Sequence, residues 1–150
     1  MNTVSTDWAG IDCPVWLERA KGFALTALDR MRKENWVVSL LFCDDDFIQT
    51  VNRDYRQKDE PTDVLSFPLG DTVEQEGGSV FLAGDIVISL PALQRNAVDF
   101  SVTPNEELKR LIVHGLLHLS GMDHTTNAPD EPMLALQETI LAQLSGEQIL

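Results

Sequence analysis

The sequence predicts a single α+β domain in which a small mixed sheet packs against helices. The length of 150 residues suits one domain, residues 1–150. The composition, 43% hydrophobic and 23% charged, is ordinary for a globular protein and argues against disorder. The helices and strands expected from periodicity also follow one another without the strict alternation of a doubly wound sheet.

Apolar residues recur at helical spacing between about Pro14 and Lys33, which predicts the first helix. Asp12 is expected to cap this helix, and Pro14 to lie in its first turn. The run WVVSLLFC, from Trp36 to Cys43, is apolar and rich in β-branched residues, so it predicts a buried strand.

Three aspartates, residues 44–46, follow this strand directly. We interpret them as a helix cap rather than a metal site, because carboxylates are favoured beside the free N–H groups of a helix start. Apolar residues from Phe47 to Tyr55 continue at helical spacing, so a second helix is expected to end near Arg56.

The middle of the chain predicts short strands and turns. Pro61-Thr62-Asp63 is expected to form a turn, followed by a strand from Val64 to Phe67 that Pro68 stops. The acidic stretch from Gly70 to Ser79 contains two adjacent glycines and predicts an exposed loop or hairpin tip.

The second half of the chain is mainly helical. A strand from Phe81 to Leu90 precedes a short helix from Pro91 to Phe100. The segment from about Asn105 to Leu119 is apolar almost all round, which predicts a helix buried in the centre of the domain and stopped by Gly121. A last amphipathic helix is expected from about Asp130 to Leu144.

All three histidines of the protein lie in HGLLHLSGMDH, residues 114–124. His114 and His118 are four residues apart and project from one helix face, and Gly121 lets the chain turn back so that His124 approaches them. Histidines on an apolar helix are usually core residues, but three within one short segment and none elsewhere favour a metal site. Three imidazoles bind a divalent ion, with zinc expected, and leave a fourth position for water, whose pKa the ion lowers to about 7.

The same spacing occurs in the zinc-protease pattern H-E-x-x-H-x-x-G-x-x-H. Gly115 stands where such a protease has the glutamate that serves as general base, which disfavours peptide hydrolysis. A glycine within a helix costs about 0.5–1 kcal/mol relative to alanine, so its presence indicates that another group approaches closely.

Three segments in this order resemble the YbeY family of bacterial rRNA maturation factors with endoribonuclease activity: NRDYRQKDEPTDVLSFP at residues 52–68, GDIVIS at residues 84–89, and the histidine segment. The resemblance covers nearly the whole chain, with Met122 where an aromatic residue is common. It implies an α+β fold with the histidine helix packed on a sheet, one zinc ion, and single-stranded RNA rather than DNA as substrate. It also implies 16S rRNA 3′-end maturation, ribosome quality control and contact with small-subunit components in the cytoplasm.

The resemblance places the metal ligands on His114, His118 and His124 and a functionally important arginine on Arg56. A guanidinium donates paired hydrogen bonds to phosphate oxygens, so Arg56 is suited to stabilise the charge that develops on phosphorus. The alternative is a solvated cation at a helix end. Arg56 and His114 are the predicted catalytic residues.

The formal net charge of −13 argues against a polyanionic partner unless a metal or a local cationic groove offsets it. Five basic residues could supply such a groove, although nothing in the sequence shows that they converge: Arg53, Lys58, Arg95, Lys109 and Arg110. Asp123 is expected either to accept a hydrogen bond from a histidine or to form the turn after the helix.

The cysteines and the hydropathy of the chain bear on the cellular compartment in which the protein is expected. Cys13 and Cys43 are far apart beside apolar residues, which predicts reduced, buried thiols. No apolar run approaches the roughly 20 residues of a membrane span, and the first residues lack the pattern of a secretion signal. Two alternatives to the nuclease stay open: a metallopeptidase, and a non-catalytic ribosome-associated protein whose zinc braces the fold.

Overall fold

The computed structural model describes residues 1–150 and contains four strands and five helices. In chain order these are β1 (Thr3–Ala9), α1 (Leu17–Arg30), β2 (Trp36–Cys43), α2 (Asp45–Arg56), β3 (Val64–Gln75), β4 (Gly78–Ser89), α3 (Leu90–Asp99), α4 (Pro104–Leu119) and α5 (Pro132–Gln143).

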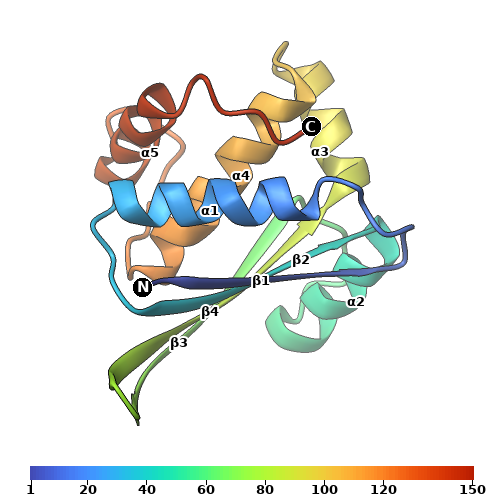
Figure 1. Cartoon of the computed structure of the whole chain (residues 1–150). Helices are drawn as coiled ribbons and strands as arrows, with labels where there is room; N and C mark the ends of the chain where they lie inside the picture. Colours follow the sequence, from blue (N-terminus) through green and yellow to red (C-terminus); the bar gives the residue numbers. More distant parts are fainter.

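The sheet is mixed, with strand order β1-β2-β4-β3. β1, β2 and β4 are parallel neighbours, and β3 pairs antiparallel with β4 as a hairpin. Helices α1, α3, α4 and α5 lie on one side of this sheet, and α2 lies on the other (Figure 1). The predicted α+β class is therefore confirmed.

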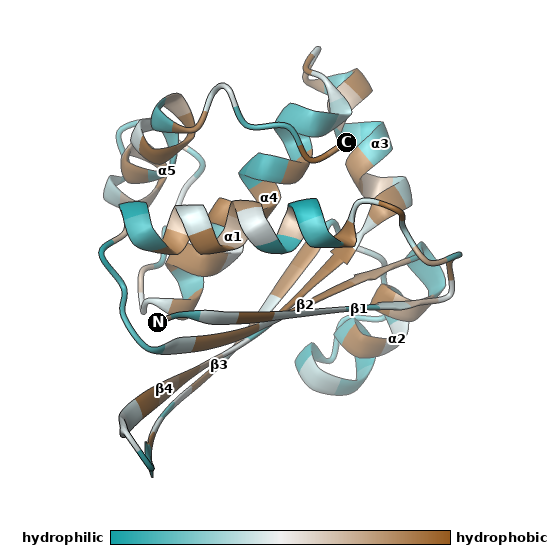
Figure 2. Cartoon of the chain, viewed as in Figure 1, coloured by the Kyte–Doolittle hydropathy of each residue, from teal (hydrophilic) through white to brown (hydrophobic).

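Helix α4 lies at the centre of the main core, as its apolar sequence predicts. Ten of its 16 residues are buried, and apolar residues also concentrate along the central strands β2 and β4 (Figure 2). A Cβ atom added at Gly115 would lie 2.8 Å from Cδ1 of Ile86 on β4. The close approach expected at Gly115 is thus the approach of the helix to the sheet.

Several boundaries agree closely with the sequence. β2 spans the predicted residues, and α2 ends at Arg56. Asp44 is the N-cap of α2, and its Oδ1 accepts a hydrogen bond from the backbone N–H of Phe47 at 2.9 Å. The capping interpretation of the aspartate run is therefore correct.

The predicted start of the first helix is wrong. Helix α1 begins at Leu17, and its N-cap is Trp16, which makes no side-chain capping hydrogen bond. Residues 10–16 instead connect the end of β1 to the helix, so Asp12 and Pro14 both precede it.

Strand β1 was not predicted from the sequence. It is an edge strand in which most side chains are exposed, and Val4 is its one fully buried residue. Its stability comes from parallel pairing with β2, more than 30 residues away in the chain, and a short polar segment carries no local signal of such pairing.

Pro68 does not stop β3, contrary to expectation. The strand continues to Gln75, and the pairing register with β4 shifts between Pro68 and Asp71. Because β3 is at the edge of the sheet and has a neighbouring strand on one side only, a proline without an N–H group is tolerated there. The predicted hairpin tip is confirmed but is confined to residues 76–77, since Gln75 already pairs with Gly78.

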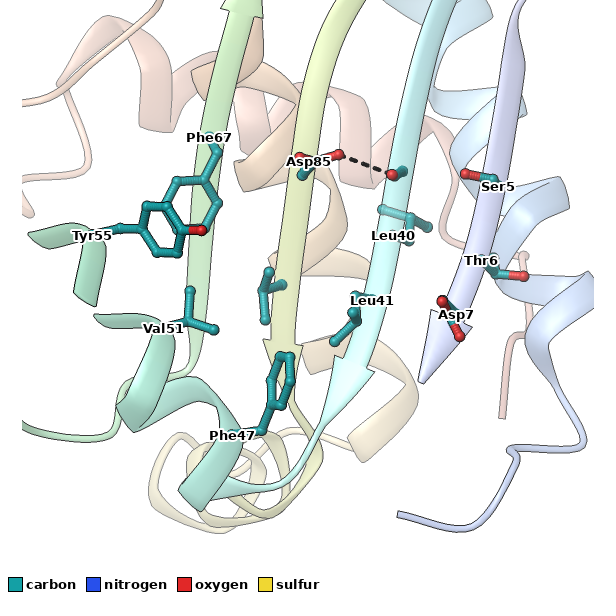
Figure 3. A pocket seen from close by; sticks show the side chains of 12 residues that line it. Ser5, Thr6, Asp7, Leu40, Leu41, Phe47, Val51, Tyr55, Phe67 and Asp85 are labelled. Carbon is teal, nitrogen blue, oxygen red and sulfur yellow. Dashed lines mark hydrogen bonds between the residues drawn. The ribbon is translucent and has the colours of Figure 1, made fainter. Parts of the chain in front are cut away.

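The sheet face that carries α2 is only partly covered. A hollow of about 610 Å³ lies there between Phe47, Val51 and Tyr55 of α2, Phe67 of β3 and the inner strands (Figure 3). On its floor, Ser39 donates a hydrogen bond to Asp85 at 2.9 Å. No helix is both long and apolar enough to cross a membrane.

Candidate metal centre

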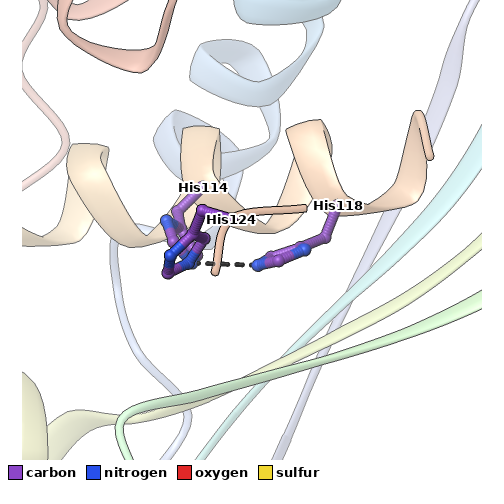
Figure 4. A group of neighbouring side chains, drawn as sticks. All are labelled: His114, His118 and His124. Atoms are coloured by element: carbon purple, nitrogen blue, oxygen red, sulfur yellow. Dashed lines mark hydrogen bonds between the residues drawn. The ribbon is translucent and has the colours of Figure 1, made fainter. Parts of the chain in front are cut away.

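Helix α4 and the turn after it bring the three histidines together. His114 and His118 lie on consecutive turns of α4, whose N-cap Thr103 accepts a hydrogen bond from the N–H of Glu106 at 3.1 Å. Gly121 takes φ +95°, a left-handed conformation that turns the chain back so that His124 reaches the other two rings (Figure 4).

The three imidazoles converge on one point. One ligand nitrogen from each ring lies within 4.8 Å of the others, and Nε2 of His118 lies 3.1 Å from Nε2 of His114. All three side chains are half-buried at the surface of the core. The predicted convergence of His114, His118 and His124 is therefore present in the structure.

Each ring also has a hydrogen-bond acceptor at its other nitrogen. Nδ1 of His114 lies 2.8 Å from Oε1 of Gln137, Nδ1 of His118 lies 3.1 Å from the carbonyl of Met122, and Nδ1 of His124 lies 2.8 Å from the carbonyl of Thr126. Since these partners are acceptors, Nδ1 is the protonated nitrogen in each ring. The Nε2 lone pairs therefore face the shared space, which is the arrangement found around metal ions.

Burial and neighbouring positive charges favour the neutral form of two of these rings. Burial lowers the pKa of His114 and of His118, and the positive charges of Arg110 and Arg56, respectively, lower these pKa values further. A hydrogen bond between the two Nε2 atoms would require one ring to give up its Nδ1 proton, and with it the hydrogen bond to its acceptor.

A divalent transition ion fits this donor set. Zinc–imidazole bonds of about 2.0–2.1 Å at tetrahedral angles separate two ligand nitrogens by roughly 3.3 Å, close to the 3.1 Å between Nε2 of His114 and His118. A cation between the lone pairs would replace their repulsion with attraction. Three imidazoles leave a further coordination position for a water or a substrate oxygen.

Arg56 lies beside the histidines, although it comes from the opposite side of the sheet. At the C-terminal end of α2, its Nη2 donates to the carbonyl of Ser66 on β3 at 2.8 Å, and its guanidinium lies 5.7 Å from the centre of the Phe67 ring. It lines a hollow of about 370 Å³ together with His114 and His118, which we call the Arg56 hollow.

Asp123 follows the turn at the end of α4. Its Oδ1 accepts the backbone N–H of His124 at 2.8 Å. The same oxygen lies 4.0 Å from Nδ1 of His118, too far for the hydrogen bond that the Met122 carbonyl already accepts. Its remaining influence is electrostatic, because its negative charge acts to raise the pKa of His118 against the larger effect of burial.

The basic residues considered for an RNA groove do not converge. Four of them line neither hollow beside the histidines: Arg53, Lys58, Arg95 and Lys109. The two arginines of this group form ion pairs with aspartates of α2, and the lysine of α4 donates to backbone carbonyls near the C-terminus. Of these five residues, only Arg110 lies beside the histidines: it lines a second hollow, different from the Arg56 hollow, that His114 also lines.

Gln137 was missed in the sequence. It is buried on α5 between Met133 and Ile140, and its amide oxygen fixes the ring of His114. A polar residue at a position whose helical neighbours are core residues was the available signal, because a buried amide needs a hydrogen-bond partner.

Comparison with known proteins identifies the relatives of this chain. Residues 13–145 match the family model described as Endoribonuclease YbeY. The chain belongs to the YbeY family. A YbeY endoribonuclease from Treponema denticola is 54% identical over 132 residues, covering 87% of this chain and 85% of the relative. The corresponding protein of Treponema pallidum strain Nichols is 46% identical over 144 residues, covering 95% and 90%.

The fold is also found in a solved structure. The solution structure of TM1509 from Thermotoga maritima matches with a TM-score of 0.67 and 26% identity, covering 97% of this chain and 91% of that one. Membership of the YbeY family confirms the resemblance inferred from the three sequence segments. It also weighs against the peptidase alternative, whose general base has no counterpart where Gly115 packs against Ile86.

Proposed function

We propose that this chain, acting as one domain over residues 1–150, is a zinc-dependent endoribonuclease that cuts single-stranded RNA. One observation carries the proposal: three imidazoles present Nε2 to a single point while an acceptor holds each Nδ1. Membership of an endoribonuclease family supplies the reaction, the cleavage of an internal phosphodiester bond.

His114, His118 and His124 are the proposed ligands of the ion. A bound zinc ion supplies Lewis-acid chemistry and lowers the pKa of a coordinated water to about 7. Gln137 and the carbonyls of Met122 and Thr126 keep the rings in the required tautomer, so the ligands are organised before the ion arrives.

Arg56 is the proposed partner of the scissile phosphate. Its Nη2 is held by the Ser66 carbonyl, which leaves other guanidinium N–H groups to donate to phosphate oxygens in the Arg56 hollow. Donors fixed where charge develops stabilise the transition state without rearrangement. His114 lines the same hollow, so a phosphate there lies between Arg56 and the metal ligands.

The local charge differs from the overall charge. A net charge of −13 repels RNA at long range, whereas a divalent ion and Arg56 outweigh the single carboxylate of Asp123 in the Arg56 hollow. RNA binding is therefore short-ranged and involves few phosphate contacts, so its salt dependence is shallow.

The biological substrate we propose is the 3′ end of 16S rRNA, with further action in ribosome quality control. This assignment is supported by family membership. Components of the small ribosomal subunit are the expected partners, and the cytoplasm is the expected location.

The test compares RNA cleavage by the untagged wild type with His118→Ala and His124→Ala. The wild type is expected to carry about one zinc ion per chain by elemental analysis and to cut a single-stranded RNA but not casein. Each variant is expected to lose the ion and at least 100-fold of the activity. His124 lies outside the helix, so that variant keeps α4 intact if His118→Ala disturbs folding.

Chelation provides a second readout. An ion bound only to the folded state stabilises it, so removing the ion is expected to lower the melting temperature, and adding zinc back to restore it. RNA cleavage that persists after chelation and in both histidine variants would overturn the proposal. Cleavage of casein alone would assign the centre to a peptidase instead.

A further inference from the structure

A second hollow adjoins the Arg56 hollow at His114. Its volume is about 700 Å³, within the range of small-molecule sites. We call it the Phe100 hollow; besides His114 and His124, its polar and aromatic lining comprises Asp63, Phe100, Arg110, Asn127, Gln137 and Glu138. His114 and Val64 line both hollows, so the two adjoin at the metal centre.

Arg110 is fixed in this hollow by a buried carboxylate. Its Nε and Nη2 donate to the two oxygens of Glu107 at 2.7 and 2.6 Å, and Glu107 is fully buried. Asn96 donates to the same carboxylate at 3.0 Å. Because Glu107 neutralises it, Arg110 is a poor site for a second phosphate, but Nη1 carries no hydrogen bond within the protein and stays available as a donor.

Phe100 supplies an exposed aromatic surface next to this donor. Its side chain follows the end of α3 and is 57% exposed, an unusual environment for a phenylalanine. The guanidinium of Arg110 lies 5.6 Å from the ring centre. Aromatic rings and guanidinium planes are the surfaces on which unpaired RNA bases stack.

The free hydrogen-bond acceptors in the hollow determine which base it favours. Both oxygens of Asp63 are engaged, one with the backbone N–H of Val64 and one with Asn96. Glu138 is exposed and receives only a 3.4 Å contact from Gln137, so its carboxylate is the free acceptor. A carboxylate accepts from N–H groups of a base edge, and an arginine donates to base oxygen and nitrogen atoms.

We propose that the Phe100 hollow binds the base of an RNA nucleotide next to the scissile phosphate and favours guanine over uracil. Guanine offers N–H groups to Glu138 and acceptors to Nη1 of Arg110, whereas uracil offers two carbonyl oxygens and a single N–H. The inference rests on the proposed function, since the phosphate attached to this nucleotide is the one that Arg56 contacts.

Binding of the four ribonucleoside 5′-monophosphates to the zinc-loaded chain, measured by isothermal titration calorimetry, tests the inference without turnover. Any contact of the phosphate with the metal centre is common to all four, so differences report the base. GMP is expected to bind at least fivefold more tightly than UMP. Phe100→Ala is expected to weaken both by about five- to tenfold through lost stacking, and Glu138→Gln to remove most of the difference between them.

Two variants serve as controls. Val98→Ala removes a 79% exposed apolar side chain from α3, two residues before Phe100, without touching the hollow, and Glu76→Gln removes an exposed carboxylate at the hairpin tip. Both are expected to bind all four nucleotides as the wild type does. Equal binding of GMP and UMP, or binding that Phe100→Ala leaves unchanged, would overturn the inference.

Sequencing the ends produced from a single-stranded RNA with randomised positions separates this inference from the proposed function. Enrichment of guanine at one position beside the cut, reduced in Glu138→Gln, is the expected result. Cleavage without any positional preference would refute the base-binding role and leave the nuclease intact. Selective GMP binding by a chain that cuts no RNA would refute the nuclease and leave the binding site.

Discussion

Arg56 and Arg110 line two adjoining hollows that share His114, and their surroundings differ in one respect. Arg56 is held by a backbone carbonyl and has no carboxylate partner, whereas Arg110 makes two hydrogen bonds to the buried carboxylate of Glu107. Both guanidinium groups lie near an aromatic ring, Phe67 in one case and Phe100 in the other.

The difference separates a cation whose charge is available to a phosphate from a cation whose charge is neutralised by a buried carboxylate within the fold. A guanidinium without a counter-ion keeps its charge for an incoming phosphate, and its removal leaves no buried charge unpaired. A guanidinium that neutralises a buried carboxylate stabilises the folded state, because that carboxylate would otherwise be left desolvated and alone. Position beside the candidate metal centre does not by itself assign a residue to catalysis.

The largest expected effect is that of Arg56→Ala on catalysis. Loss of one preorganised donor to the transition state typically lowers kcat about 100- to 1000-fold, and we expect a similar fall in kcat/KM for RNA. The melting temperature is expected to stay within about 2 °C of wild type, and the zinc content within a few per cent. Full turnover in this variant, with metal verified by elemental analysis, would remove Arg56 from the mechanism.

Arg110→Ala is expected to act mainly on stability. Removing one partner of a buried ion pair costs about 3–5 kcal/mol, and because the Arg110 side chain is 29% exposed we expect a loss of about 2–4 kcal/mol in the free energy of unfolding. Urea denaturation measures it, with Arg56→Ala as the matched control. A change below 0.5 kcal/mol would show that Arg110 is as dispensable to the fold as Arg56.

Removing both charges of the buried pair at once separates the cost of the unpaired carboxylate from the cost of lost packing. In the double variant Glu107→Gln, Arg110→Met no buried charge remains unpaired, and Asn96 can still donate to the new amide oxygen. We expect this variant to lose only about 1 kcal/mol, less than Arg110→Ala alone. Additive losses would mean that packing, rather than the unpaired carboxylate, explains the cost of Arg110→Ala.

The sequence predicted those features of the centre that depend on local spacing. His114 and His118 project together because they are four residues apart, and Gly121 permits the turn that brings His124 back. The capping aspartate of α2 and the apolar runs of β2 and α4 were equally local signals. The role predicted for Arg56 came from family resemblance and not from local spacing, since Arg56 belongs to α2, which lies on the opposite side of the sheet from α4 (Figure 1).

Features that depend on distant pairing could not be predicted. β1 is stabilised by β2, the His114 ring is oriented by Gln137 on α5, and Pro68 is tolerated because β3 happens to be an edge strand. The ion pair between Arg110 and Glu107 could be expected from their i,i+3 spacing on a helix. Only the burial of Glu107, however, distinguishes this pair from an ordinary surface contact.

The smallest expected effect is that of Arg95→Ala, which isolates burial as the cause. Arg95 contacts both oxygens of Asp45, at 2.8 and 3.1 Å, so its bonding resembles that of Arg110. Its side chain is 56% exposed and that of Asp45 30%, however, and Ser89 donates to the same carboxylate at 2.8 Å. The arginine holds the pKa of Asp45 below its ordinary value, but water screens the attraction and solvates the carboxylate when the arginine is removed.

Thermal melting of Arg95→Ala is therefore expected to shift by no more than about 2 °C, with RNA cleavage unchanged. A loss of stability as large as that of Arg110→Ala would show that two-point bonding alone, without burial, stabilises the fold, and the distinction between the two arginines beside His114 would then need a different cause.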